Sequence, residues 1–317
     1  TCALPILINS KKSLKLFFRK LGNYMPKSNI AIVTDTNSGI FPEEGQKLGI
    51  TVIRMPFFLN GKQYYENDDL SAKDFFETME NNPNIEFSTS MPATGEIYTI
   101  WTELLKDHDE VVYIPMSSGL SSSCAAASQI AMEFEGKVQV VNNQRISLTQ
   151  TQSVLDAITL KNQGKSAKEI KAILEEQKYD SSIYISVGSL DYLKKGGRVT
   201  PAAALLGGML KIKPVLQIQG EKLDSFAKSH GIKAAKKTMI KAIKKDLDGR
   251  FKEYADKDEM RVFIAYTYTD EQIIQEWLDE VQTAFPKHKI VAQQLSLSIS
   301  CHTGPGCLAI GCARIIK

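Results

Sequence analysis

Runs of apolar, β-branched residues alternate along the chain with amphipathic segments of helical periodicity. Residues 30–35 form one such run, and residues 42–48 form the helical segment that follows, with Gly49 as its stop signal. Further apolar runs lie at residues 111–116, 138–142 and 184–187. Repeated strand–loop–helix units predict a parallel sheet with helices on its faces. We therefore expect an α/β fold that binds its ligand at the carboxyl ends of the strands.

One segment departs from this alternation. Residues 51–59 predict a strand, and Asn60-Gly61 followed by residues 62–65 is typical of a β-hairpin. Ser71 and Asp74 then resemble a capping box ahead of another helix.

Residues 184–214 join a buried strand to a basic glycine turn and an apolar helix. Thr200-Pro201 predicts the start of that helix. Residues 202–210 give it no polar face, so it must be covered on every side by protein or by an apolar ligand. Gly196-Gly197 frees the backbone to turn and places Arg198 at the mouth of the apolar region. The alternative is a helix that packs between two domains and an Arg198 that pairs with a surface acid.

Hydroxyl side chains gather at two predicted helix starts. Thr89 and Ser90 precede a helix at residues 95–105, and a serine-rich loop that includes Ser118 follows the strand at residues 111–116. Helix starts leave backbone N–H groups unpaired and carry partial positive charge, so hydroxyls there indicate a carboxylate or phosphate site. The alternative is that these residues only cap their helices.

His302 lies between a predicted strand end and the turn at residues 303–306. It is either a ligand-binding residue or a histidine that only pins the turn through a hydrogen bond. A Ser118–His302 nucleophile pair would predict a hydrolase or phosphotransferase, with Asp35 as the nearest orienting acid. The chain has no GxSxG, Walker A, GxGxxG or HExxH motif, so we favour a binding protein over an enzyme.

Length and composition bound these interpretations. A chain of 317 residues predicts two domains, which we place at residues 30–188 and 189–317. Its 39 basic and 36 acidic residues are interspersed and give a net charge of +3, which argues against nucleic-acid binding. No apolar run approaches the ~20 residues of a membrane span. Five cysteines without a CxxC pair indicate reduced thiols in a cytoplasmic protein, and we expect no metal or other cofactor.

Residues 1–29 form a basic N-terminal extension that does not follow the pattern. Leu14, Phe17, Phe18 and Leu21 repeat at helical spacing among lysines and arginines. Such a basic amphipathic helix predicts transient contact with an anionic membrane surface. The alternatives are a helix packed on the domain, a misassigned start upstream of Met25, or a leader foreign to the protein.

Six motifs together resemble those of the DegV family: IAIVTDTNSGI, STSMPATGE, IPMSSGLSSS, LKKGGR, the helix ending in KIKP, and HTGPG. The resemblance covers residues 30–317. DegV proteins are bacterial fatty-acid-binding proteins that serve as the acyl-carrying subunit of fatty acid kinase. The resemblance implies a two-domain α/β fold, with a parallel-sheet N-terminal domain, a second α/β domain and a long-chain fatty acid buried between them.

Carried onto this sequence, the resemblance implies carboxylate-binding hydroxyls at Thr89, Ser90 and Ser118. It adds Arg198 and His302 to the ligand-binding set. It implies no catalytic residue and no cofactor here, because such proteins present the acyl carboxylate to a separate kinase that phosphorylates it with ATP.

The sequence departs from the family pattern at two places in the N-terminal half. The motif that is usually DSxSD reads DTNSG at residues 35–39, and Asn142-Asn143 replaces an acid. The chain still supplies the apolar lining and the polar groups that such a ligand requires. Burying roughly 14 methylenes contributes on the order of 11 kcal/mol gross, while burying an ionised head group without a partner costs several kcal/mol, so both parts are needed. We therefore expect an elongated apolar cavity that reaches Thr89 and Ser118.

Overall fold

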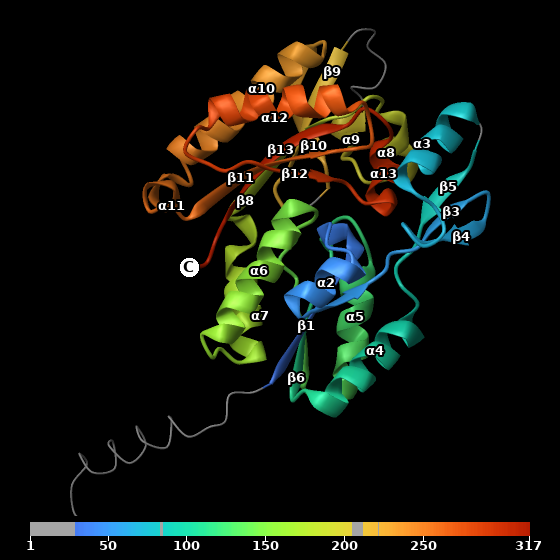
Figure 1. Ribbon diagram of the computed structural model, residues 1–317, viewed down its shortest axis with the longest axis vertical. Coiled ribbons are helices and arrows are strands. Elements are labelled where there is room, and N and C mark those ends of the chain that lie inside the picture. Colours follow the sequence, from blue (N-terminus) through green and yellow to red (C-terminus); the bar gives the residue numbers. More distant parts are fainter. Residues whose placement is uncertain (1–28, 83–84, 205–211, 221) are drawn as a thin grey trace, which may run out of the picture.

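The computed structural model describes residues 29–82, 85–204, 212–220 and 222–317. This part of the chain forms two α/β domains, one built on a parallel sheet and the other on a larger mixed sheet, with a small antiparallel sheet beside them (Figure 1). The predicted fold class is therefore confirmed. The predicted basic helix at residues 11–21 lies outside the described residues, as does most of the predicted apolar helix.

The N-terminal domain contains a four-stranded parallel sheet in the order β2-β1-β6-β7. Its strands are β1 (Ile30–Asp35), β2 (Thr51–Ile53), β6 (Glu110–Ile114) and β7 (Val138–Val140). The helices around it are α2 (Pro42–Leu48), α4 (Thr94–Asp107), α5 (Ser123–Ala131), α6 (Leu148–Asn162) and α7 (Ala167–Glu176). Three short 3-10 turns complete it: η1 (Thr36–Ser38), η2 (Met132–Phe134) and η3 (Gln177–Tyr179).

Both faces of this sheet are buried, as expected for parallel strands. Trp101 of α4 and Ala127 of α5 belong to the core on one face, and Leu160 of α6 and Ile170 of α7 to the core on the other. The strands are consequently continuous apolar runs, and every residue of β1 is buried.

The second domain contains a six-stranded sheet in the order β10-β9-β8-β13-β11-β12. Its strands are β8 (Ser181–Ser186), β9 (Ile212–Ile218), β10 (Asp224–His230), β11 (Met260–Tyr266), β12 (Val291–Gln294) and β13 (Leu308–Arg314). Only β11 and β12 pair in parallel. The outer face is covered by α10 (Ile232–Asp248) and α12 (Glu271–Ala284), with α11 (Lys252–Asp256) at one end (Figure 1).

The sheets correct the predicted domain boundary. We assigned residues 181–188 to the N-terminal domain, but β8 pairs with β9 and β13 in the middle of the second sheet. A buried apolar strand has the same local sequence in either domain, so periodicity alone could not assign it. By sheet membership the boundary lies between η3 and β8.

A small antiparallel sheet, β4-β3-β5, contains β3 (Phe57–Leu59), β4 (Lys62–Tyr64) and β5 (Phe87–Thr89), with α3 (Ala72–Asn81) beside it. Asn60 and Gly61 have φ of 48° and 78°, so the predicted hairpin turn is confirmed. The prediction of one strand over residues 51–59 is wrong, because β2 and β3 belong to different sheets.

The small sheet packs on the second domain although its residues precede most of the N-terminal domain. Phe57 and Phe75 share a buried cluster with Leu297 and Cys301 of α13 (Leu297–Thr303) and with Tyr192 of α8 (Asp191–Gly196). Figure 1 shows α3 and β3–β5 beside these two helices. This packing brings the end of β5 to the helix that carries His302.

Candidate functional site

A cavity of about 330 Å³ lies between the two domains, within the size range of small-molecule sites. The second sheet provides an apolar wall that includes Ile183, Ile185, Ile218, Phe263 and Ala265. The loops that follow β1 and β6 provide the opposite wall, with Asn37, Met116, Leu120, Ser121 and Ser122 among the lining residues. The cavity therefore lies at the carboxyl ends of the parallel strands, as the sequence predicted.

Four of the five predicted site residues line this cavity: Thr89, Ser90, Arg198 and His302. They come from β5, from the loop after it, from the turn after α8 and from α13. Ser118 is not among the lining residues, and the cavity instead meets Ser121 and Ser122 of the same loop. A role for Ser118 in binding therefore stays a prediction.

His302 lies inside a helix rather than at the strand end that the sequence predicted. Ser296 caps α13 by accepting a hydrogen bond from Ile299 N, and the helix ends at Gly304. The two β-branched residues and the serines of this segment are weak helix formers, so the sequence pattern did not predict a helix. The helix aims His302 at the small sheet, where its Nε2 lies 2.7 Å from Thr89 Oγ1.

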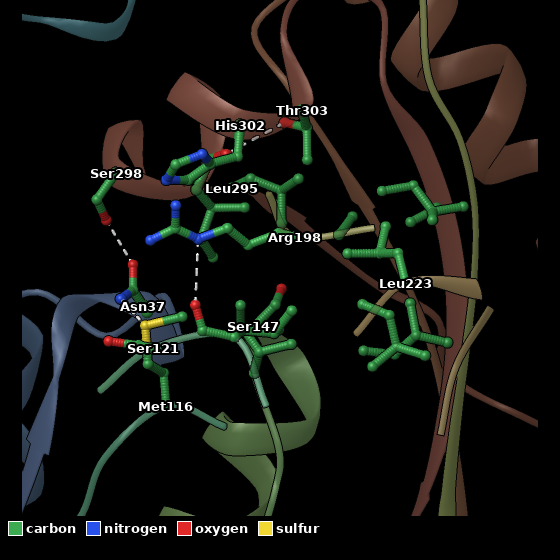
Figure 2. A pocket seen from close by; sticks show the side chains of 18 of the residues that line it. Asn37, Met116, Ser121, Ser147, Arg198, Leu223, Leu295, Ser298, His302 and Thr303 are labelled. Atoms are coloured by element: carbon green, nitrogen blue, oxygen red, sulfur yellow. Dashed lines mark hydrogen bonds between the residues drawn. The ribbon is translucent and has the colours of Figure 1, made fainter. Parts of the chain in front are cut away.

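The other ring nitrogen of His302, Nδ1, is buried and has no hydrogen-bond partner in the described part of the chain. Burial and the nearby charge of Arg198 lower the pKa of His302 to about 4, so the ring is neutral at neutral pH. Figure 2 shows the imidazole directly beside the Arg198 guanidinium. Because the ring is neutral, Arg198 carries the positive charge at this point, and one bound anion would balance it.

Two glycines make this arrangement possible. A Cβ on Gly196 would lie 2.3 Å from His302 Nδ1, so only glycine lets the ring pack against the end of α8. Gly197 has a φ of +68° and ends α8 as its C-cap, with its N–H bonded to Leu193 O. The chain then turns so that Arg198 enters the cavity.

Arg198 has no acidic partner within the described ranges of the chain. Its Nε donates to Leu120 O at 3.3 Å, and a second guanidinium nitrogen contacts Gly196 O. Among the described residues no carboxylate lies within 4.0 Å of it, so the pairing with a surface acid that we kept as an alternative is not found there. Partial burial lowers the pKa of Arg198 from its usual value. An anion in the cavity would supply the missing charge.

The serine hydroxyls around the cavity have local roles as well. Ser121 Oγ pairs with Ser123 Oγ at 2.8 Å and accepts from Ser123 N at 3.1 Å, so this hydroxyl is bonded within its own loop, although the N-cap residue of α5, Ser122, makes no side-chain capping hydrogen bond. Ser122 Oγ reaches only Met91 Sδ, at 3.8 Å, and a thioether is a weak acceptor. Ser122 is thus a hydroxyl with hydrogen-bonding capacity left for a ligand.

Asn37 is a lining residue that the sequence analysis did not select. Its Oδ1 accepts from Ser296 Oγ at 2.9 Å and from Ser298 Oγ at 2.5 Å, and these two bonds fix the amide. Its Nδ2 then faces Met116 Sδ (Figure 2), so its donors meet only a weak acceptor. The sequence contained a signal that could have selected Asn37, because this residue belongs to the DTNSG motif at residues 35–39, which departs from the family pattern.

The geometry provides no Ser118–His302 hydrogen bond in the described part of the chain, since His302 pairs with Thr89 instead. Asp35, the candidate orienting acid, accepts from Met116 N at 2.9 Å, from Asn37 N at 3.0 Å and from Gln150 Nε2 at 3.2 Å. Burial raises its pKa to about 6. Asp35 therefore organises the loops under the cavity rather than orienting His302.

The described residues lack two further features. They contain no group of three or more His, Cys, Asp or Glu side chains placed to hold a metal ion. They also contain no helix with the length and hydropathy that a bilayer crossing requires.

Fold and site define a class: a two-domain α/β protein whose cavity has an apolar wall on one sheet and, on its polar side, an arginine that no described carboxylate pairs with. The model of the DegV family, described as uncharacterised proteins, matches residues 29–314. The chain belongs to the DegV family.

Relatives and solved structures agree with this assignment. A DegV domain-containing protein from Streptococcus pneumoniae is 28% identical over 286 residues, which is 89% of this chain and 98% of the relative. One from Deinococcus radiodurans is 34% identical over 207 residues, or 65% of this chain and 73% of the relative. Two solved structures, each 28% identical, are a fatty-acid-binding DegV family protein from Thermus thermophilus and DegV, a fatty acid binding protein, from Bacillus subtilis. Their TM-scores are 0.81 and 0.76, over 90% of this chain and 100% and 99% of theirs.

Proposed function

We propose that this protein binds a long-chain fatty acid with its acyl chain against the second sheet and its carboxylate at Thr89, Ser90, Ser118, Arg198 and His302. The observation that carries this proposal is the guanidinium of Arg198, which lines a cavity with an apolar wall and has no acidic partner among the described residues. A cation in such a place is costly unless an anion joins it, and a fatty acid supplies both the anion and the apolar chain. The fatty-acid-binding relatives from T. thermophilus and B. subtilis support the same ligand.

The ligand can be tested directly by organic extraction of the purified protein and mass spectrometry, followed by titration of the delipidated protein with palmitic or oleic acid. We expect Arg198→Gln to weaken binding by roughly 10- to 100-fold, because a charge-assisted hydrogen bond contributes about 1.5–3 kcal/mol. Lys241→Gln is the matched control, since Lys241 is exposed on α10 on the outer face. Delipidated protein that binds no added fatty acid would overturn the proposal.

Thr89→Ala combined with Ser118→Ala tests the hydroxyls. We expect weaker ligand binding, because both side chains would serve the ligand, and a loss of no more than about 1–3 kcal/mol in the stability of the ligand-free protein, because Thr89 Oγ1 also pairs with His302 Nε2. Loss of thermal stability without loss of affinity would show that these hydroxyls are only caps. The single variants then tell whether Ser118, which does not line the cavity, contributes at all.

We further propose that the protein is not itself an enzyme and presents the bound carboxylate to a separate fatty acid kinase. His302 pairs with Thr89, and no Ser118–His302 pair is formed in the described residues, which supports a carrier over a hydrolase. ATP and the kinase from the same organism should yield acyl phosphate, trapped as a hydroxamate, only when both proteins are present. Acyl phosphate or ester turnover by the isolated chain, lost in Ser118→Ala, would favour the enzyme instead.

Two features bear on where the carrier works. The described cysteines, Cys124, Cys301, Cys307 and Cys312, are buried and free, and the kinase reaction requires ATP; both support a cytoplasmic location. The basic extension at residues 1–29 supports transient contact with an anionic membrane. Co-sedimentation with phosphatidylglycerol vesicles should fall when residues 1–28 are deleted, and unchanged binding would contradict the membrane role.

A further inference from the structure

The inner face of the second sheet presents two successive rows of side chains to the cavity. Register pairs Ala265 with Ala309 and Ile185 in the first row. The second row lies two residues farther along each strand. It consists of Phe263 in β11, Gly311 in β13, Ile183 in β8 and Ile218 in β9, which are paired in register in that order. Residues two apart on a strand point to the same face, and all members of both rows line the cavity.

The second row is the last one that the cavity reaches. The next residues on the same face are Arg261, Ala313 and Ser181, which are also in register, and none of them lines the cavity. His302 precedes β13, so Ala309 lies nearer to the His302 end of the strand and Gly311 farther from it. The row of Phe263 therefore marks the end of the cavity away from the head-group residues.

At this end an aromatic ring lies on a glycine. A Cβ built on Gly311 would lie 2.4 Å from Cε2 of Phe263, 2.9 Å from its Cζ and 2.8 Å from Ser182 O. The ring thus occupies the space in which any other residue at position 311 would place its side chain. Glycine inside a strand weakens the sheet and commonly marks such a close approach.

We infer that the Phe263–Gly311 pair is the end wall of the acyl cavity and sets the longest chain that it accepts. This inference rests on the proposed fatty acid ligand and adds to it the residues that select chain length. Gly311 lets the Phe263 ring lie down across β13, where it closes the cavity without filling it. A side chain at position 311 would push the ring toward the ligand, and removal of the ring would extend the cavity past the second row.

The test is the affinity of delipidated protein for lauric, myristic, palmitic, stearic and arachidic acids, measured by displacement of a fluorescent fatty acid. In Phe263→Ala the ratio of affinities should shift toward the longer acids by roughly tenfold or more, since one methylene in an apolar pocket changes affinity by at least about that factor. Phe263→Leu should give a smaller shift in the same direction. Gly311→Ala should shift the ratio toward the shorter acids.

Val262→Ala is the matched control, because Val262 neighbours Phe263 in β11 but is buried in the core on the opposite face, against α10 and α12. It should lower the melting temperature without changing the ratio of affinities for long and short acids. An unchanged ratio in folded Phe263→Ala and Phe263→Leu would overturn the inference, even if Gly311→Ala failed to fold. Absence of binding for every acid in the unaltered protein would instead contradict the proposed function itself.

Discussion

At the scale of single residues, the site is a set of polar groups that the protein leaves unsatisfied. Arg198 lacks a carboxylate partner among the described residues, His302 Nδ1 lacks a hydrogen-bond partner, and the Asn37 amide meets a thioether. Buried polar groups in proteins are nearly always hydrogen-bonded, so two such groups beside a partly buried arginine indicate a binding site. Arg198 and Asn37 Nδ2 are hydrogen-bond donors, and His302 Nδ1 is a donor in the tautomer whose Nε2 accepts from Thr89; donors are what a carboxylate requires.

His302 offers a residue-level test. The pKa of about 4 in the folded protein lies below the usual histidine value of 6.5, so between these values the unfolded chain binds more protons than the folded one. The contribution of His302 to stability is therefore fully present above pH 6.5 and is lost as pH falls toward 4. A carboxylate beside the ring would favour the imidazolium, so we expect fatty acid to raise the pKa of His302.

NMR of the His302 Cε1–H signal across this pH range, with and without palmitic acid, measures both effects. The signal is assigned with His302→Gln, and His230, on the exposed edge of β10, is the control that should not respond to ligand. Equal pKa values of His302 in the free and loaded protein would contradict a carboxylate at this ring.

At the scale of elements, sequence patterns predicted what local chemistry determines. The alternation of apolar runs and helical segments predicted β1, α2 and β6, and Asn60-Gly61 predicted the hairpin, because each signal lies within the element itself. The pattern did not predict that β8 would join the second sheet, since the strands that pair in a sheet can be distant in sequence. The helix around His302 was missed because α13 depends on the Ser296 cap and on packing against the small sheet.

The same distinction explains which site residues could be predicted. Thr89, Arg198 and His302 were selected because each stands beside a turn or helix start with a recognisable pattern. Choosing between Ser118 and Ser121 within one serine-rich loop requires the loop conformation, which the pattern does not contain.

The contact of α8 with α13 gives an element-level prediction. Gly196→Ala would place a methyl group 2.3 Å from His302 Nδ1, so the ring must leave its position beside Thr89. We expect a loss of about 1–3 kcal/mol in the free energy of unfolding and weaker fatty acid binding. Urea denaturation and ligand titration measure the two effects.

Gly95→Ala is the control for this substitution. Gly95 lies in the first turn of α4, and a Cβ there would meet no atom within 4 Å. Its replacement should leave binding unchanged and be neutral or stabilising by up to about 1 kcal/mol. Equal stability and affinity of Gly196→Ala and Gly95→Ala would show that the glycine turn is not required for the position of His302.

At the scale of the whole molecule, the cavity exists only because the two domains meet. One wall comes from the second sheet and the other from the loops after β1 and β6. Direct hydrogen bonds join these walls: Ser296 and Ser298 donate to Asn37 Oδ1, Gln293 Nε2 donates to Gly39 O at 3.0 Å, and Ser117 Oγ donates to Gly220 O at 3.0 Å. The contacts that hold the domains together thus also hold the two walls of the cavity in place.

Substitution of Asn37 can measure how strongly the two domains are coupled at the cavity. Its Oδ1 accepts from two buried hydroxyls of the other domain, so Asn37→Ala leaves them with only local partners. We expect the free energy of unfolding to fall by about 1–3 kcal/mol, the usual cost of losing a buried hydrogen-bond partner. The double-mutant cycle with Ser298→Ala should give a coupling of about 1 kcal/mol.

Urea denaturation followed by both fluorescence and circular dichroism measures the cycle and tests whether the domains unfold together. Gln275→Ala, which removes an exposed contact to Asp279 on α12, should change stability by less than about 0.5 kcal/mol.

If Asn37 joins the domains, fatty acid should raise the stability of the Asn37→Ala variant less than that of the unaltered protein, because in the variant part of the ligand's binding energy is spent on bringing the two cavity walls together. Equal stabilisation of both, together with a coupling near zero, would mean that the domains are held in place independently of Asn37 and that the cavity is already formed before the ligand enters.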